Sequence, residues 1–263
     1  MERWLPHRNQ KGSQMSHRLP HSLATRRASA CSLLGAAWLV ACGGGSPDGN
    51  TGGPQQLPGT QPSLGVSYTG EGTYYGATGA GACSYDPSPQ NLMVAAMNSP
   101  QWQNSAVCGM CVEVTGPKGE ANKIVVRIVD LCPECKSGDL DLSQEAFAKI
   151  AEPVMGRVKI TWQPVACAVS GPISYKYKDG TSQWWMGVQV RNSRLPVKRV
   201  ELKEGASYID LKPESYGYYT LSSPNGRPGP YSFRLTSTTD AQLTEPSIPL
   251  SPSTPVQGTQ QFP

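Results

Sequence analysis

The stretch Val125–Phe147, VVRIVDLCPECKSGDLDLSQEAF, joins a strand pattern to a tight loop with two cysteines and a second acidic cluster. Its first five residues are almost continuously apolar, which is typical of a strand buried on both faces. Asp130 ends this strand, and Asp141 lies just before a segment with helical periodicity. Two carboxylates placed in this way predict a functional site, and the rest of the sequence bears on whether the pair cleaves a substrate or only binds it.

The composition of the 263 residues favours a turn-rich β protein, because Gly (28) and Pro (24) are abundant and only 16% of residues are charged. The formal charge of +4 comes from residues 1–42, which hold six of the Lys and Arg residues but a single acidic one. Residues 43–263 carry 17 basic and 18 acidic residues. Neither nucleic acid nor an anionic membrane surface is therefore indicated as a partner.

All three histidines, His7, His17 and His21, lie in the same N-terminal part of the sequence. The remaining 221 residues, 43–263, contain none. Ser–His and Cys–His catalysis, His-ligated zinc and an imidazole base are therefore excluded from that part of the chain.

Residues 1–42 have the pattern of an export signal. Arg26 and Arg27 form its charged region, and residues 33–41 form an apolar core too short to span a bilayer. The core ends in LVAC, which resembles the bacterial lipobox and predicts lipidation of Cys42. The alternative is an ordinary cleavage site beside a chance cysteine. Either way, the sequence predicts an extracytoplasmic protein, secreted or lipid-anchored at the bacterial cell surface.

Composition divides the rest of the chain into four parts. Residues 43–66 are rich in Gly and Pro and predict a disordered linker. Residues 67–170 hold all the remaining cysteines, and residues 171–240 are rich in Tyr, Trp and short alternating runs, so two domains are predicted. Residues 241–263 form a Pro/Ser/Thr-rich tail, either extended and packed on the last domain or a second flexible end.

An even number of cysteines in an exported chain predicts three disulfides among Cys83, Cys108, Cys111, Cys132, Cys135 and Cys167. Fifteen connectivities are possible, and the sequence alone does not choose among them. The two C-x-x-C pairs allow a four-thiolate zinc site as an alternative. Export and the two cysteines left over oppose zinc, so neither a metal nor a cofactor is expected.

The first domain alternates short β segments with turn signals, which predicts a small closed β-barrel with helical excursions. One helix is predicted over residues 88–97, with Ser88 as N-cap and Pro89 in the first turn. A second is predicted from Ser143 as N-cap, with the apolar residues 146, 147 and 150 on one face.

Four motifs in order, GTYYG, GACSY, VVRIVDLCPEC and DLDLSQEAFAKI, resemble the six-stranded double-psi β-barrel of expansins. Certain endoglucanases and lytic transglycosylases of the rare-lipoprotein type share that barrel. The resemblance implies that Asp130 is the essential aspartate, Asp141 the second acidic position, Thr73 the hydroxyl facing it and Tyr75 its near neighbour. Bacterial members often carry a tyrosine where this chain has Cys132, which puts that sugar contact in doubt.

The order of cysteines in related plant proteins implies the pairs Cys83–Cys108, Cys111–Cys167 and Cys132–Cys135. This pairing is a hypothesis that the resemblance supplies.

The second domain contains a predicted hairpin around Asp179-Gly180, followed by strands at intervals typical of an immunoglobulin-like β-sandwich. Flat aromatic rings stack on the C–H faces of sugars. Adjacent residues of a regular strand point to opposite faces, so either Trp184 or Trp185 would lie in the core unless a bulge intervenes. The WW and VQVRN pattern resembles expansins, which implies a binding face of Trp184, Trp185 and a tyrosine, with Lys178 as a basic contact. Tyr216 is the best match for the tyrosine, and Tyr218 and Tyr219 are the alternatives.

Together these observations predict an all-β chain with short helices, in which a double-psi β-barrel precedes an immunoglobulin-like β-sandwich. The resemblance implies a monomeric, non-hydrolytic protein that loosens plant cell walls by binding cellulose and xyloglucan-like glucans, with peptidoglycan as a further polymer. Two alternatives stay open. One is a lytic glycan-cleaving enzyme, either an endoglucanase or a peptidoglycan transglycosylase. The other is a carbohydrate-binding module with an inert barrel.

Overall fold

The computed structural model describes residues 61–263. The predicted signal peptide, the lipidation site at Cys42 and the linker up to residue 60 lie outside the described residues. Within residues 61–263, no helix combines the length and the apolar character that crossing a bilayer requires.

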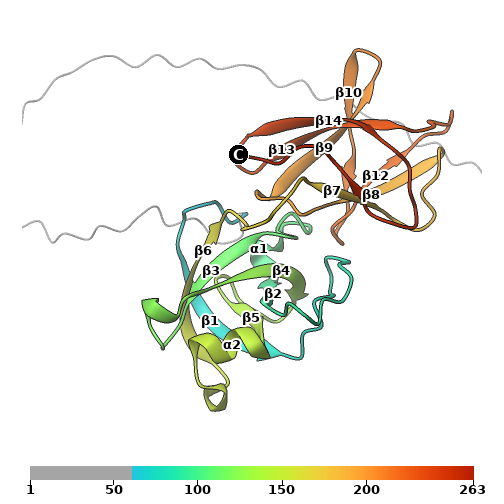
Figure 1. Ribbon diagram of the computed structural model, residues 1–263. Coiled ribbons are helices and arrows are strands. Elements are labelled where there is room, and N and C mark those ends of the chain that lie inside the picture. The colour runs from blue at the N-terminus through green and yellow to red at the C-terminus, as the bar shows by residue number, and fades with distance from the viewer. Residues whose placement is uncertain (1–60) are drawn as a thin grey trace, which may run out of the picture. The chain divides into compact units, whose positions relative to one another are not determined.

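The first domain is a closed six-stranded barrel with the strand order β1-β5-β2-β4-β3-β6 (Figure 1). The pairs β1–β5 and β2–β4 are parallel, and the other pairs are antiparallel. This confirms the predicted barrel. Its strands are β1 (Tyr68–Tyr75), β2 (Val94–Asn98), β3 (Cys111–Thr115), β4 (Ile124–Cys132), β5 (Leu140–Ser143) and β6 (Val158–Val165).

Barrel closure depends on a close backbone approach between β1 and the loop before β5. A Cβ atom on Gly70 would lie 2.2 Å from the carbonyl oxygen of Gly138, so only glycine fits there. The same carbonyl accepts a hydrogen bond of 2.7 Å from the indole of Trp162, which is 1% exposed. The loop that leads into the second acidic strand is thereby fixed against the barrel core.

The helix predicted after Ser143 is confirmed as α2 (Gln144–Ile150), and the Ser143 hydroxyl accepts the amide N–H of Ala146. The helix predicted over residues 88–97 is wrong, because its apolar half forms β2. All five residues of β2 are buried between β4 and β5, and a short run that is apolar on both faces has no periodicity to distinguish strand from helix. The short helices α1 (Ser99–Trp102), η1 (Glu120–Asn122) and η2 (Pro153–Met155) complete the domain.

Three disulfides staple the barrel: Cys83–Cys108, Cys111–Cys167 and Cys132–Cys135. They confirm the pairing that the resemblance implied. Because all four cysteines of the two C-x-x-C pairs are bonded in this way, the four-thiolate zinc alternative is wrong. The last disulfide closes the loop between β4 and β5, next to both acidic positions.

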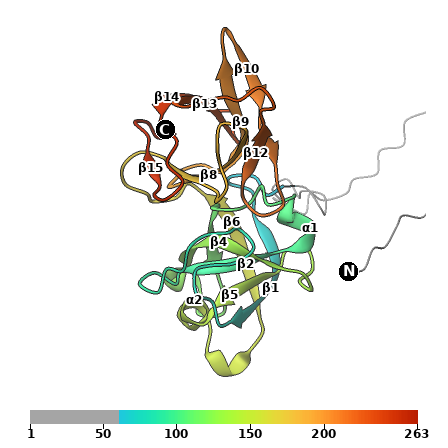
Figure 2. The ribbon, with the colours of Figure 1, turned by 90° about the vertical axis from the view of Figure 1, so that its right-hand side faces the viewer.

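The second domain contains a four-stranded sheet, β10-β9-β13-β14, and a five-stranded sheet, β11-β12-β8-β7-β15 (Figure 2). Its core contains Tyr175, Val188, Phe233 and Leu235. The predicted hairpin is the antiparallel pair β7–β8. The strands are β7 (Ser174–Tyr177), β8 (Trp185–Arg191), β9 (Val197–Glu204), β10 (Ser207–Asp210), β11 (Lys212–Pro213), β12 (Tyr219–Ser222), β13 (Tyr231–Ser237), β14 (Gln242–Ile248) and β15 (Val256–Gln257).

The predicted boundary at residue 240 is wrong, because residues 241–263 belong to the sandwich. Strand β14 pairs with β13, β15 pairs with β7, and Phe262 is 1% exposed in the core. Both strands lie at sheet edges, where a residue such as Pro246 leaves no ladder hydrogen bond unmade. The Pro-rich composition of residues 241–263 therefore hid two edge strands from sequence analysis. Of the two predictions for this tail, packed on the last domain or flexible, the packed one is correct.

Candidate functional site

Three of the four predicted barrel residues, Thr73, Asp141 and Asp130, lie in one row across four neighbouring strands. Thr73 on β1 is the Cα partner of Asp141 on β5, Asp141 is the partner of Ala96 on β2, and Ala96 is the partner of Asp130 on β4. Neighbouring strands are about 4.8 Å apart, so the Cα atoms of the two aspartates are separated by about 10 Å. The buried Ala96 lies between them in the sheet.

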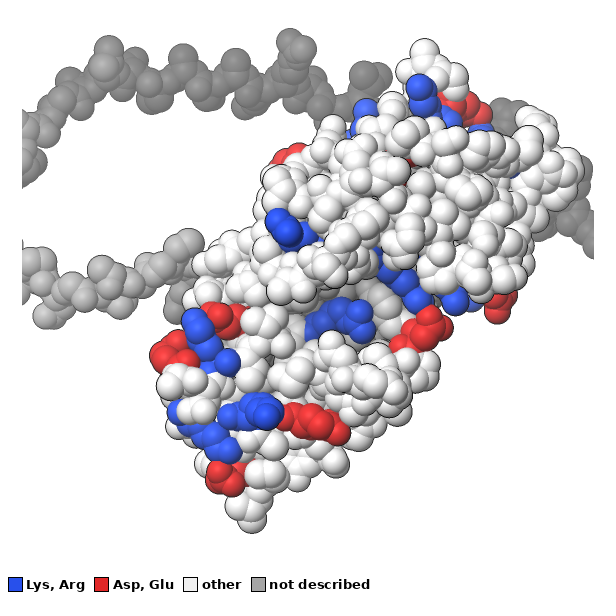
Figure 3. Space-filling model, in the orientation of Figure 1, with Lys and Arg blue, Asp and Glu red and all other residues white. Residues whose placement is uncertain are grey.

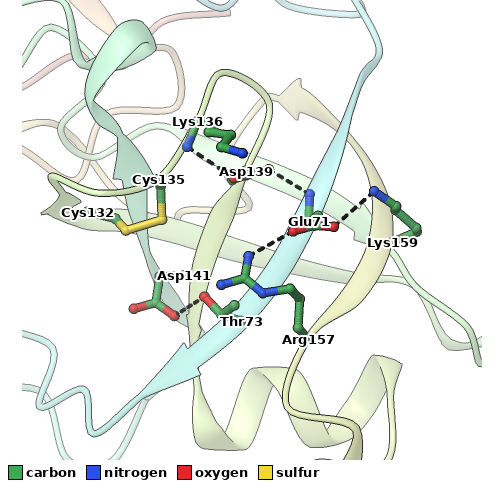
Figure 4. Close-up of polar contacts among 9 residues, drawn as sticks. All are labelled: Glu71, Thr73, Cys132, Cys135, Lys136, Asp139, Asp141, Arg157 and Lys159. Atoms are coloured by element: carbon green, nitrogen blue, oxygen red, sulfur yellow. Dashed lines mark hydrogen bonds and ion pairs between the residues drawn. A yellow bond between two sulfur atoms is a disulfide. The ribbon is translucent and has the colours of Figure 1, made fainter.

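Asp141 is oriented by a hydrogen bond of 2.6 Å from the Thr73 hydroxyl to its Oδ1 (Figure 4). Burial raises the pKa of Asp141, and the negative charges of Glu134 and Asp130 act in the same direction. The hydrogen bond from Thr73 and the charge of Arg157 partly offset this increase in pKa. Asp141 is therefore a carboxyl group whose protonation is favoured by its surroundings.

Asp130 is oriented by the backbone. Its Oδ1 accepts the amide N–H of Ala82 at 2.7 Å and the amide N–H of Leu131 at 2.9 Å. A Cβ atom on Gly81 would lie 2.4 Å from the Asp130 Cγ, so the GACSY segment can reach the carboxylate only with glycine at this position. One carboxylate oxygen is thus occupied by the protein, which leaves Oδ2 for a ligand.

Tyr75 lies two residues after Thr73 on β1, so its side chain projects from the same face of the strand. Burial, followed by the charges of Asp130 and Asp141, raises the pKa of its hydroxyl group. That hydroxyl is buried and has no hydrogen-bond partner among the described residues. The Tyr75 hydroxyl is therefore kept protonated near both carboxylates, in a position that is not exposed to a ligand.

The disulfide Cys132–Cys135 lies beside the Thr73–Asp141 pair (Figure 4). Cys132 is 4% exposed, so its side chain offers almost no surface to a ligand. The position at which the resemblance expects a tyrosine contact is therefore taken by a covalent loop closure.

In the sandwich, Trp184 is 54% exposed and Trp185 is partly exposed, and neither ring belongs to the core. The alternative in which one of them is a core residue is wrong. Strand β8 begins only at Trp185, and Trp184 belongs to the preceding bend, where its amide contacts the Ser182 hydroxyl. The rule that adjacent residues point to opposite faces of a strand does not apply at such a bend.

Each tryptophan ring rests on a glycine, which sequence reasoning missed. A Cβ atom on Gly187 would lie 2.8 Å from the Cη2 atom of Trp185, and one on Gly226 would lie 2.8 Å from the Cζ3 atom of Trp184. Gly187 follows Trp185 by two residues, and this spacing within a strand was the available signal. The close contacts hold both rings against the backbone.

Tyr216 stands beside the predicted basic residue. The Lys178 Nζ lies 5.5 Å from the ring centroids of both Tyr216 and Tyr218, within cation–π range. Tyr218 is only 6% exposed, so Tyr216 is the ring available to a ligand. We call Trp184, Trp185 and Tyr216 the aromatic platform.

Hydrogen bonds connect the barrel to the sheet that carries the platform. The Gln189 side chain donates to the Cys83 carbonyl at 2.6 Å, and the Ser105 hydroxyl donates to the Glu214 carbonyl at 2.6 Å. Gln189 follows Trp185 by four residues on β8, so it lies on the same face of the strand. The platform face therefore continues to the contact with the barrel.

The raised pKa of Asp141 leads to a pH prediction. A carboxyl pKa that is higher in the folded state means that the native protein binds the proton more tightly than the unfolded chain does. The ionised group then lowers the free energy of unfolding at neutral pH, and the deficit disappears as the pH falls below the unfolded value of about 4. Asp141→Asn is therefore expected to be more stable than the parent at pH 7, in urea unfolding, with no such difference at pH 3.

Asp86→Asn is the matched control with the opposite sign. The hydrogen bond from Arg191 lowers the pKa of Asp86, so its ionised form stabilises the fold above the unfolded pKa. This variant is expected to be less stable than the parent at pH 7. If both variants are destabilised to the same extent at pH 7, the assignment for Asp141 is wrong.

Comparisons with known proteins place the chain among proteins of this architecture. Residues 94–162 match a family model described as lytic transglycolase. The chain is 35% identical to Expansin-YoaJ of Bacillus subtilis (strain 168), over 65% of this chain and 71% of that protein. It is 30% identical to expansin-like protein 1 of Dictyostelium discoideum, over 63% of this chain and 61% of that protein.

Two solved structures of the Clavibacter michiganensis expansin each cover 74% of this chain and 98% of their own. The apo form matches with a TM-score of 0.68 and 30% identity. An Asp→Asn mutant in complex with cellohexaose matches with a TM-score of 0.69 and 29% identity. Sequence similarity over most of a relative and a shared order of barrel and sandwich lead to one conclusion: the chain belongs to the expansin family.

Proposed function

We propose that this expansin loosens plant cell walls without hydrolysis, by binding cellulose and matrix glucans and disrupting the contacts between them. The observation that carries the proposal is the aromatic platform, in which both tryptophan rings lie outside the core and rest on glycines. Rings held in this way lose little conformational freedom on binding a flat polymer face. The complex of the Clavibacter relative with cellohexaose supports a glucan as ligand.

The barrel would act on a glucan by hydrogen bonding. The free oxygen of Asp130 accepts from a sugar hydroxyl. Thr73 fixes Asp141 on the opposite side of Ala96. Glucan chains adhere to one another through hydrogen bonds of the same kind. A glucan chain bound along this row would exchange its hydrogen bonds to neighbouring glucans for hydrogen bonds to the protein.

Hydrolysis of a glycosidic bond needs a proton donor and a separate base or nucleophile across the sugar ring. In this row each aspartate is oriented through its Oδ1, by Thr73 for Asp141 and by two amides for Asp130, and keeps Oδ2 for a sugar hydroxyl, which suits the binding role expected of an expansin. We infer that the pair binds and orients the sugar and does not carry out the two-carboxylate reaction.

A lytic enzyme is the second candidate function. The match of residues 94–162 to a family model described as lytic transglycolase favours it, and so does the raised pKa of Asp141, which suits a proton donor. Peptidoglycan would then be the substrate, and a lipid anchor at Cys42 would hold the enzyme at the cell surface. We propose the same extracytoplasmic location, and a monomer, for the wall-loosening function.

One preparation of the exported protein tests both functions. We expect it to cause creep of clamped plant wall strips and to bind cellulose, with no reducing sugar released from cellulose and no soluble fragments released from peptidoglycan. Fragments that accumulate in proportion to time and protein concentration would replace the first function with the second. Binding to cellulose with neither creep nor release would leave a binding module with an inert barrel.

A further inference from the structure

A cavity lies where the barrel and the sandwich meet within the described residues. It has a volume of about 780 Å³, within the range of known ligand sites. Its lining includes neither the barrel row with Asp130 and Asp141 nor the ring pair Trp184 and Trp185. Figure 3 shows a hollow of this kind, with blue basic side chains inside it.

Arg127 and Arg191 line this cavity, and both guanidinium groups lie near the same aromatic ring. The guanidinium carbon of Arg127 lies 4.8 Å from the ring centroid of Tyr85, and that of Arg191 lies 5.4 Å from it. Arg191 also forms an ion pair of 2.6 Å with Asp86. Arg127 is half-buried and has no carboxylate within 4.0 Å in the described part of the chain, so its charge is not neutralised.

The other charged residues of the cavity are satisfied by their own partners. Lys198 pairs with Asp240, and the Glu214 carboxylate accepts from Lys212 and from the Thr220 hydroxyl. Arg127 is thus the one cation of the lining for which the described residues provide no counter-charge. A partly desolvated charge without a counter-charge is unfavourable, and an anionic ligand would remove that penalty.

The rest of the lining suits a hydroxylated ligand. Tyr219 is partly exposed and contributes ring surface, and six amide and hydroxyl side chains line the same cavity as Arg127. The amides and hydroxyls are those of Asn91, Gln103, Asn104, Ser105, Asn192 and Ser193. Asn104 and Asn192 donate their amide N–H groups to backbone carbonyls and keep their side-chain oxygens to accept from sugar hydroxyls. A ring beside such acceptors suits a sugar, whose C–H face stacks on the ring.

We propose that this cavity binds a uronic acid residue of an acidic wall polysaccharide, with the Arg127 guanidinium holding the sugar carboxylate. The planar fork of arginine matches a carboxylate with two parallel hydrogen bonds. That the ligand is an anion is inferred from Arg127 alone. That this anion is part of a saccharide rests on the proposed function. The protein would then bind two wall polymers at two sites, a neutral glucan and an acidic polysaccharide.

Calorimetric titration of the exported protein with trigalacturonate tests the proposal. A charge-assisted pair contributes enough that Arg127→Gln should weaken this binding at least about tenfold. Arg127→Lys keeps the charge but loses the fork, so its affinity for trigalacturonate should lie between those of the parent and Arg127→Gln. Arg199→Gln is the matched control, because this arginine pairs with Glu201 and does not line the cavity. The affinity of Arg199→Gln for trigalacturonate should equal that of the parent.

The methyl ester of trigalacturonate separates the sugar from its charge. The parent should bind the ester at least about tenfold more weakly than the acid, and Arg127→Gln should bind both forms equally weakly. Equal affinities of Arg127→Gln and Arg199→Gln for the acid would overturn the proposal, and so would inorganic phosphate binding at Arg127 as tightly as trigalacturonate. Cellulose binding by the Arg127 and Arg199 variants should equal that of the parent. A parent that does not bind cellulose would contradict the proposed function, and the trigalacturonate result would still stand.

Discussion

Replacing Trp184 and Trp185 together by alanine is expected to weaken binding to cellulose about 100- to 1000-fold. Central aromatic residues of a binding surface contribute about 2 kcal/mol each, and every 1.4 kcal/mol corresponds to a tenfold change in affinity. Neither ring belongs to the sandwich core, so the variant should unfold at the same urea concentration as the parent. Depletion of protein from solution by cellulose measures the first quantity, and urea unfolding measures the second.

Two further variants sharpen this experiment. Tyr208→Ala removes an aromatic ring from β10, in the other sheet, where Arg234 lies 4.0 Å above it, and should leave cellulose binding unchanged. Gly187→Ala keeps every ring but places a methyl group where Trp185 now rests, so it should weaken binding by displacing that ring. Full cellulose affinity in the double tryptophan variant would remove the platform from the function.

Much of this arrangement was predictable because it depends on local chemistry. Ser143 as a cap and the Asp179-Gly180 turn act within a few residues, and both are where the sequence predicts them. The apolar run before Asp130 likewise forms the central strand β4. The disulfide pairing needed the resemblance, because spacing alone allows fifteen choices.

The features that escaped prediction depend on contacts between distant residues. Strand β2 looks like half a helix until β4 and β5 bury it on both faces. Gly81 and Gly226 look like ordinary loop glycines, and only the fold brings them against Asp130 and Trp184. Arg127 is three residues from Asp130 in sequence, yet it lines the cavity to which the sandwich contributes Arg191, and both arginines lie near the Tyr85 ring.

Asp130→Asn is expected to abolish wall creep while leaving cellulose binding within about twofold of the parent. The asparagine Oδ1 can still accept the amides of Ala82 and Leu131, so the loop before Cys83 should remain in place. The remaining carboxylate oxygen becomes an NH₂ group, which donates where the glucan hydroxyl requires an acceptor. Asp240→Asn, which neutralises an exposed aspartate in the other domain, is the control and should creep like the parent.

The Asp130→Asn variant also distinguishes sugar binding from cleavage of the glycosidic bond, because the two functions assign different roles to the same carboxylate. In a lytic enzyme, the substitution removes fragment release, and creep is only a consequence of shortened chains. In the proposed function there is no release to remove, and creep is lost because the acceptor in the row is lost while the platform still holds the polymer. Creep that persists in Asp130→Asn would mean that the sandwich alone loosens the wall, and that the row from Thr73 to Asp130 serves only the stability of the barrel.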